Sequence, residues 1–165
     1  MATHETTVRW QDTDEALAVL PKLDGIDYLK KMANGEIPAA PIVSHFGMDL
    51  TVVEHGKVVF ECTPNDSHHN PIGSVHGGVV CTLLDSALGC AAHTTLPAGV
   101  GYTSVEIKVN YMGAVRSDSG PLRCTGRVTK PGRRITFAEG EVVDKNGKLV
   151  ASASGTLLVF PLDGA

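Results

Sequence analysis

The segment VHGGVVCTLLDSALGCAAH, residues 75–93, constrains the fold of this chain more than any other part of its sequence. Apolar residues lie on every side of a helix drawn through it, so such a helix has too little polar surface for the outside of a globular protein. We therefore expect a helix that is buried inside a larger structure. Asp85 interrupts the segment, and the apolar stretches on either side of it are too short to span a membrane.

Segments that alternate between polar and apolar residues surround this helix. Residues 48–54 and 57–63 flank His55-Gly56, a two-residue hairpin loop in which glycine supplies a positive φ. Residues 101–112, 121–130, 133–144 and 148–160 follow the helix, and Pro131-Gly132 and Asn146-Gly147 provide the last two turns. The order predicts an α+β fold, in which an antiparallel sheet of about six strands wraps around one long central helix.

The first 44 residues differ from the rest. Pro21 breaks a short apolar stretch, and DYLKKM at residues 27–32 has the pattern of a helix. We expect residues 1–44 to form an N-terminal helical extension and residues 45–162 to form the main domain. The extension is either an arm that only packs on the main domain or one that also covers a bound substrate. A chain of 165 residues is too short for a (β/α)₈ barrel, which needs about 250 residues.

Charge and cysteine content narrow the function classes. The net charge of −4 gives no general attraction to nucleic acid or to an anionic membrane. Residues 116–134 nevertheless hold six basic residues against one acidic residue, which leaves room for a local anion site. The cysteines show no C-x-x-C pair, so we expect free thiols in a cytoplasmic protein. They are Cys62, Cys81, Cys90 and Cys124.

Two glycines, Gly77 and Gly78, follow His76 at the start of the predicted helix. Each costs about 1 kcal/mol relative to alanine inside a helix, unless another group approaches the backbone closely. The free N–H groups of the first turn lie at the positive end of the helix dipole, where they can stabilise a carbonyl oxygen that gains negative charge. Close packing of the helix on the sheet also explains the glycines, and the glycines alone do not separate these two interpretations.

Asp85 lies in the middle of the apolar segment. A buried carboxylate needs hydrogen bonds or a raised pKa, and such groups cluster at functional sites. The alternative is a polar helix stripe that faces water, formed by Asp85 together with Thr82, Ser86, Gly89 and His93.

Helix geometry separates Asp85 from the helix start. Eight residues of rise place Asp85 about 12 Å from Gly77 along the helix axis, too far for both to act on one carbonyl group. Two chains related by a two-fold axis would solve this, with Gly77 from one chain and Asp85 from the other. The sequence therefore predicts a symmetric homodimer with two active sites in its interface.

The sequence from residue 45 to residue 160 resembles the hotdog-fold acyl-CoA thioesterases of the PaaI-like group. The resemblance rests on NPIGSVHGGVVCTLLDSALG, on YTSVEIKVNYM, and on the two arginines after Pro131-Gly132. It implies hydrolysis of an acyl-CoA substrate without a metal or a bound cofactor, since CoA is part of the substrate. It also implies a homodimer that pairs into a homotetramer, as a dimer of dimers.

The same resemblance implies roles for single residues. Asp85 would attack the thioester or activate water, and the Gly77 N–H would bind the carbonyl oxygen. Asn70 would hold that carbonyl or the water, His76 would orient the loop and Asn70, and Ser104 would help to place the water.

Further residues complete the predicted substrate site. Gly78 and Thr103 are predicted to bind the substrate. Thr103 is adjacent to Ser104, so an alignment with the family pattern that is wrong by one residue would exchange the roles of these two residues. Arginine and lysine bind phosphate oxygens well, so the hairpin cluster of Lys130, Arg133 and Arg134 is predicted to contact the CoA phosphates. A solvated hairpin end is the alternative. The acyl group is not identified, but its pocket is expected to include Phe46, Met48, Ile72 and Leu88.

Three other functions fit parts of the pattern. A non-hydrolytic acyl-CoA binding or sensing module would have the same fold. A dehydratase or hydratase would use His76 and Asp85 for proton transfer. Metal-dependent hydrolysis fits least, because the histidines form no H-E-x-x-H motif. His68 and His69 are expected to be a solvated loop pair.

Overall fold

The computed structural model describes residues 1–162 and contains a single six-stranded sheet, in which every neighbouring pair of strands is antiparallel. The strand order is β1-β2-β4-β5-β6-β3, so β1 and β3 form the two edges. The strands are β1 (Met48–Glu54), β2 (Lys57–Cys62), β3 (Val100–Tyr111), β4 (Leu122–Lys130), β5 (Ile135–Val143) and β6 (Leu149–Pro161).

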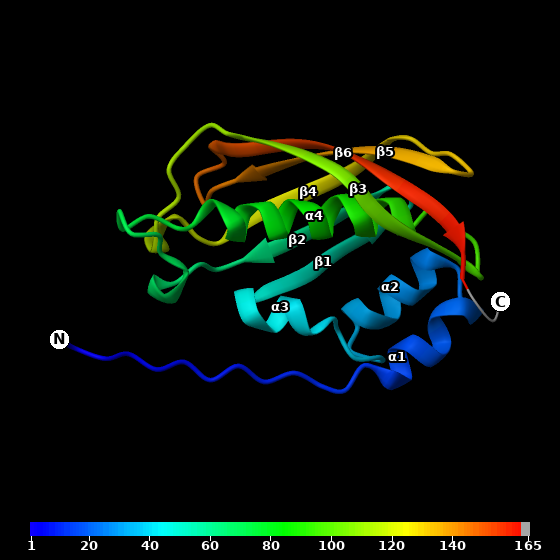
Figure 1. Cartoon of the computed structure of the whole chain (residues 1–165), viewed down its shortest axis with the longest axis horizontal. Coiled ribbons are helices and arrows are strands. Elements are labelled where there is room, and N and C mark those ends of the chain that lie inside the picture. Colours follow the sequence, from blue (N-terminus) through cyan, green and yellow to red (C-terminus); the bar gives the residue numbers. More distant parts are fainter. Residues whose placement is uncertain (163–165) are drawn as a thin grey trace.

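The sheet curves around one long helix, α4 (Gly77–His93), which lies along its concave face (Figure 1). Contacts of α4 with β2, β3, β4, β5 and β6 hold the helix there. The predicted fold class is therefore confirmed, and the ends of α4 and of the strands fall within two residues of their predicted positions.

Glycines on the inner face of the sheet let α4 approach closely. A Cβ atom on Gly126 of β4 would overlap the backbone carbonyl oxygen of Ala87. A Cβ atom on Gly140, the residue paired with Gly126 across β4 and β5, would lie 2.6 Å from Cδ1 of Leu88. The helix therefore packs directly against the backbone of the central strands.

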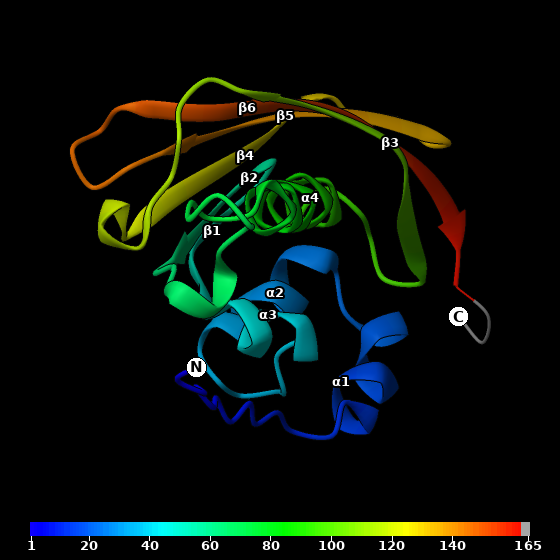
Figure 2. The ribbon, with the colours of Figure 1, turned by 60° about the vertical axis from the view of Figure 1, so that its left-hand side comes forward.

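The N-terminal residues form a third layer on the other side of α4 (Figure 2). This layer contains α1 (Asp14–Val19), the 3₁₀ turn η1 (Leu20–Lys22), α2 (Gly25–Ala33) and α3 (Pro41–Phe46). Its buried cluster of Ala16, Tyr28, Leu29 and Ile37 packs on β1 and on Cys90 of α4. The central helix is apolar on all sides because the sheet covers one side and these helices cover part of the other.

Two short 3₁₀ turns, η2 (Asp66–His68) and η3 (Ser117–Ser119), lie in the loops near the start of α4 and before β4. All four cysteines are free thiols, as predicted. Among residues 1–162, no helix combines the length and the apolar character needed to cross a membrane.

Candidate active site

The first turn of α4 has an open backbone. His76 is the N-cap residue, and its Nδ1 atom accepts a 2.9 Å hydrogen bond from the N–H of Gly78. Within residues 1–162, no hydrogen bond uses the N–H of Gly77. The Gly77 N–H is thus the free donor at the positive end of the helix dipole.

Tyr111, at the end of β3, lies directly over Gly77. Its hydroxyl donates a 2.9 Å hydrogen bond to the carbonyl oxygen of Gly77, and a Cβ atom on residue 77 would come within 3.1 Å of the tyrosine ring. A side chain at residue 77 would therefore press against the tyrosine ring. Sequence reasoning missed Tyr111, because only the fold brings two residues 34 positions apart into contact.

Asn70 holds the loop that leads into α4. Its Oδ1 atom accepts hydrogen bonds from the N–H groups of Ile72 and Ser74, and its Nδ2 atom donates to Oγ of Ser74. Among the described residues, no hydrogen bond joins Asn70 to His76. The expected contact between their side chains is therefore not present in the single chain, and His76 orients the helix start instead.

The prediction of a solvated pair at His68 and His69 is wrong for His68, which is buried. The Nδ1 atom of His68 accepts a hydrogen bond from the N–H of Asn65, and its carbonyl oxygen accepts a 2.8 Å bond from the N–H of His76. His68 thus supports the loop before α4. Among residues 1–162, no group of three histidine, cysteine or acidic side chains is placed to hold a metal ion.

Asp85 lies midway along α4 and is exposed, so the expected burial of its carboxylate is wrong for the single chain. The Ser104 hydroxyl of β3 donates a 2.8 Å hydrogen bond to Oδ1 of Asp85. The alternative of a polar stripe facing water also holds only in part. Gly89 and His93 are buried, because Tyr102 packs against Gly89 and Tyr28 against His93.

Asp85 borders a cavity of about 600 Å³ between α4, the strands β1 and β3, and the N-terminal helices. Asp85, Ser86 and Ser104 form a polar part of its wall, and the extension contributes the apolar side chains of Met32 and Val43. A cavity of this size is typical of small-molecule sites. The N-terminal extension is therefore part of the wall of the cavity that contains Asp85.

The helix start opens into a different hollow. His76 and Gly78 line a space of about 320 Å³ with Phe46 and His68, and Asp85 is not part of it. The two predicted halves of the site are thus separate in the single chain.

Ser104 and Thr103 lie on opposite faces of the strand β3. Side chains alternate along a strand, and Ser104 points to Asp85, so Thr103 is on the opposite face of β3, where it is exposed. Of the residues expected in the acyl pocket, Met48 lines the Asp85 cavity. Ile72 is exposed and Leu88 packs against the sheet glycines, so neither lines this cavity.

The predicted phosphate contacts lie at the other end of α4. Lys130, Arg133 and Arg134 are exposed around the turn between β4 and β5, and none forms an ion pair within residues 1–162. Arg133 borders a hollow with Leu96 and Val100, which follow the C-terminus of α4.

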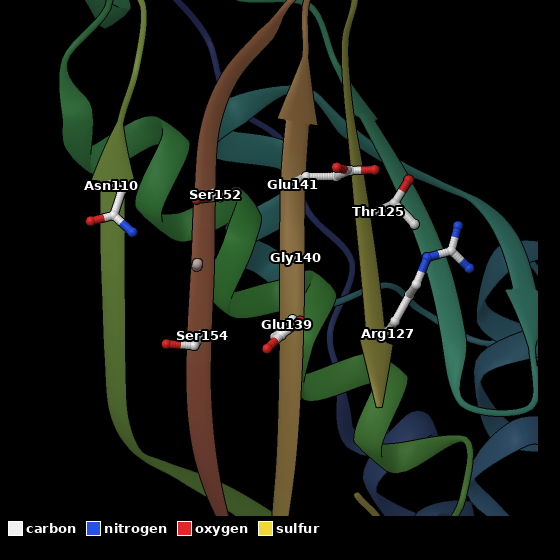
Figure 3. Close-up of a pocket in the computed structure, with 9 residues that line it drawn as sticks. Asn110, Thr125, Arg127, Glu139, Gly140, Glu141, Ser152 and Ser154 are labelled. Atoms are coloured by element: carbon white, nitrogen blue, oxygen red, sulfur yellow. The ribbon is translucent and has the colours of Figure 1, made fainter. Parts of the chain in front are cut away.

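A further hollow, of about 380 Å³, lies on the outer face of the sheet, with α4 behind it (Figure 3). Its side chains are polar and include two carboxylates, Glu139 and Glu141, beside Arg127. This hollow lacks the apolar lining of a typical small-molecule pocket.

The curved sheet around a central helix, with a carboxylate midway along that helix, defines an α+β protein of the hotdog fold. Residues 72–151 match the family model of the thioesterase superfamily. Human acyl-coenzyme A thioesterase 13 is 31% identical over 102 residues, which cover 61% of this chain and 71% of that protein. The chain therefore belongs to the thioesterase superfamily, and it is a thioester hydrolase, as predicted.

Solved structures have the same fold. A conserved protein from Pseudomonas aeruginosa is 30% identical, with a TM-score of 0.69 over 74% of this chain and 95% of that one. The Escherichia coli PaaI protein has a TM-score of 0.71 over 87% of this chain and 98% of that one, and its 20% identity shows a shared fold.

Proposed function

We propose that this protein hydrolyses acyl-CoA thioesters to the free acid and CoA, with Asp85 as the catalytic carboxylate. The observation that carries this proposal is the pair formed by Asp85 and Ser104 at a largely apolar cavity, since a thioester substrate needs a polar reacting centre beside an apolar acyl pocket. The name of the human relative supports CoA as the thiol component.

The reaction has two forms that both use Asp85. As a general base, Asp85 takes a proton from water while the water oxygen bonds to the thioester carbonyl carbon. As a nucleophile, a carboxylate oxygen of Asp85 bonds to that carbon, and water then hydrolyses the resulting anhydride. In each form the carbon–sulfur bond breaks, and the sulfur leaves as the CoA thiolate and takes up a proton.

The negative charge that develops on the carbonyl oxygen needs a donor. The Gly77 N–H meets this need, because it is free and lies at the positive end of the α4 dipole. Asn70 shapes the loop beside it and has an amide hydrogen left for the carbonyl oxygen or a water molecule, while His76 fixes the helix start.

The two halves meet if two chains pair through β3. This strand is an edge of the sheet, 12 residues long, and Val105 and Tyr111 are each 55% exposed on it. A long unpaired edge readily pairs with a second strand. A two-fold axis makes the pair antiparallel, so the Tyr111 end of one β3, with its Gly77, lies beside the other chain's Val100 end.

This pairing also gives the basic cluster a function. Arg133 borders a hollow with Val100 of its own chain, and Lys130 and Arg134 flank the same β4–β5 turn, so a homodimer brings this cluster toward the partner's helix start. There they bind the phosphates of CoA, while the thioester lies between Gly77 of one chain and Asp85 of the other. Gly78, next to the donor, completes the proposed set of substrate contacts, and Thr103 is left out of it because it lies on the face of β3 that points away from Asp85.

The outer face of the sheet suits a further association into a homotetramer. Four apolar side chains are more than a third exposed there, on neighbouring parts of β5 and β6. They are Ile135, Phe137, Leu158 and Phe160. An apolar patch of this kind marks a contact surface, and we propose that it joins two dimers.

Release of CoA thiol from a panel of acyl-CoA esters tests the proposed function. We expect Asp85→Asn to lower kcat by roughly 100- to 10,000-fold, the range of general acid–base catalysis. Asp49, another carboxylate on the same cavity, provides the comparison, and Asp49→Asn should retain activity to within about threefold because Asp49 lacks the Ser104 contact. Acyl-CoA binding without thiol release would instead identify a binding module.

A further inference from the structure

The Asp85 cavity continues toward a second one. The second cavity has a volume of about 310 Å³ and lies between η1, α2, α4 and the start of β3. Four residues line both cavities, so these residues form the boundary between them: Met32, Ala40, Cys90 and Tyr102.

Met32 is the long, flexible member of this boundary. Ala40 and Cys90 have short side chains. Tyr102 is held in place, since a Cβ atom on Gly89 would come within 2.7 Å of its ring and its aromatic neighbour His93 lies at 5.5 Å between ring centroids. Methionine has three rotatable bonds and adapts to irregular spaces. The width of the passage therefore depends chiefly on Met32.

The second cavity is lined by uncharged groups. Leu20, Leu29 and Leu162 provide apolar surface, and none of the lining residues is a lysine, an arginine or an acidic residue. His93 also lines it, and burial lowers the pKa of His93 to about 4, so its ring is neutral at neutral pH. A charged end group would lose its hydration here without gaining a partner.

We infer that the acyl group is an uncharged aliphatic chain that runs from Asp85 along the N-terminal helices, and that Met32 determines the chain length that the enzyme accepts. The inference rests on the proposed function for the position of the thioester at Asp85. It assigns the N-terminal extension a direct part in substrate selection, because α2 carries Met32 and the α2–α3 segment lines the cavity next to Asp85.

Binding of alkyl-CoA thioethers tests this inference separately from hydrolysis, because a thioether cannot be hydrolysed. Calorimetry on the whole chain would measure Kd for a series of thioethers that runs from S-ethyl-CoA to S-tetradecyl-CoA. In the wild type, Kd should fall about fourfold for each added methylene group that becomes buried, until the chain fills the accessible space. Met32→Ala should extend this fall to longer chains. Met32→Trp should stop it at shorter chains and leave S-ethyl-CoA within about twofold of the wild type.

Ile37→Ala is the matched control. Ile37 is buried in the same N-terminal cluster but lines neither cavity, so its loss loosens the extension without widening the passage. Its chain-length profile should match that of the wild type. Identical profiles for the wild type and Met32→Ala, equal shifts in Ile37→Ala and Met32→Ala, or no dependence on chain length would each overturn the inference. Chain-length-dependent binding without any release of thiol from acyl-CoA would refute only the proposed function.

Discussion

The hydroxyl of Ser104 donates a 2.8 Å hydrogen bond to Oδ1 of Asp85, across the boundary between the edge strand β3 and the central helix. One carboxylate oxygen is thereby held in a fixed direction, while the carboxylate itself is exposed in the single chain. A carboxylate that is oriented but accessible is suited to act on a substrate carbonyl or on a water molecule.

Removal of this hydrogen bond should reduce catalysis without unfolding the protein. We expect Ser104→Ala to lower kcat by roughly 10- to 100-fold, the equivalent of a hydrogen bond to a charged group, with Ser104→Thr recovering part of the loss. Thr103→Ala, on the opposite face of β3, should change kcat by less than about threefold. Steady-state thiol release measures all three. Equal losses in Ser104→Ala and Thr103→Ala would show that the hydrogen bond to Asp85 has no catalytic role.

A side chain at residue 126 should destabilise the protein, because Gly126 packs against the backbone of Ala87. A methyl group on residue 126 would overlap the Ala87 carbonyl oxygen, so α4 would have to move away from the sheet. We expect Gly126→Ala to lower the free energy of unfolding by about 1–3 kcal/mol, measured by urea denaturation. Gly113→Ala is the control, because its Cβ atom would lie at an ordinary 3.6 Å from Val150. A Gly126→Ala variant as stable as Gly113→Ala would contradict this account of the packing.

The elements of this fold were predictable because they are local. Alternation marks the strands, and Gly56 and Gly147 have φ values of 72° and 78° in the turns that their sequences indicated. The buried helix followed from its composition alone. The helix α3 was not predicted, since it is only six residues long and begins at a proline within a loop-like sequence.

The site was less accessible to sequence reasoning, because its contacts join distant residues. The spacing from Gly77 to Asp85 is readable along one helix, and the neighbours of Gly77 at the helix start, His76 and Gly78, border a different hollow from Asp85. The contacts of Tyr111 with Gly77 and of Met32 with the Asp85 cavity depend on how β3 and α2 pack on α4. No periodic pattern within a single segment contains this information.

The burial of His93 should make stability depend on pH. Burial lowers the pKa of His93 from 6.5 to about 4, so the unfolded chain binds a proton at this histidine more readily than the folded chain does. The stabilisation is complete above pH 6.5 and is lost as the pH falls toward 4, by up to about 3 kcal/mol. Its neighbours Tyr28, Tyr102 and Cys90 do not titrate in this range, because burial raises the pKa of each.

Urea denaturation at several pH values checks this dependence. Between pH 6.5 and pH 4, the unfolding free energy of the wild type should decrease by up to about 3 kcal/mol more than that of His93→Gln. His55→Gln, which removes an exposed histidine of the first hairpin, should leave the decrease unchanged. Parallel curves for the wild type and His93→Gln would show that His93 is protonated as easily in the folded protein as in the unfolded chain.

A heterodimer of two defective chains would decide whether the site is shared between chains. Asp85→Ala lacks the carboxylate, and Gly77→Pro lacks the backbone N–H donor at the first helical position, where proline fits the helix. Each homodimer should be nearly inactive. Pairing one chain of each kind reunites an intact Gly77 with an intact Asp85 in one of the two sites, so the isolated heterodimer should recover about half of the wild-type turnover per dimer. Two different affinity tags would permit its purification after co-expression, with doubly tagged wild-type dimers as the reference. A site contained within one chain predicts instead that the heterodimer is as inactive as its parents, because every chain then lacks one essential group.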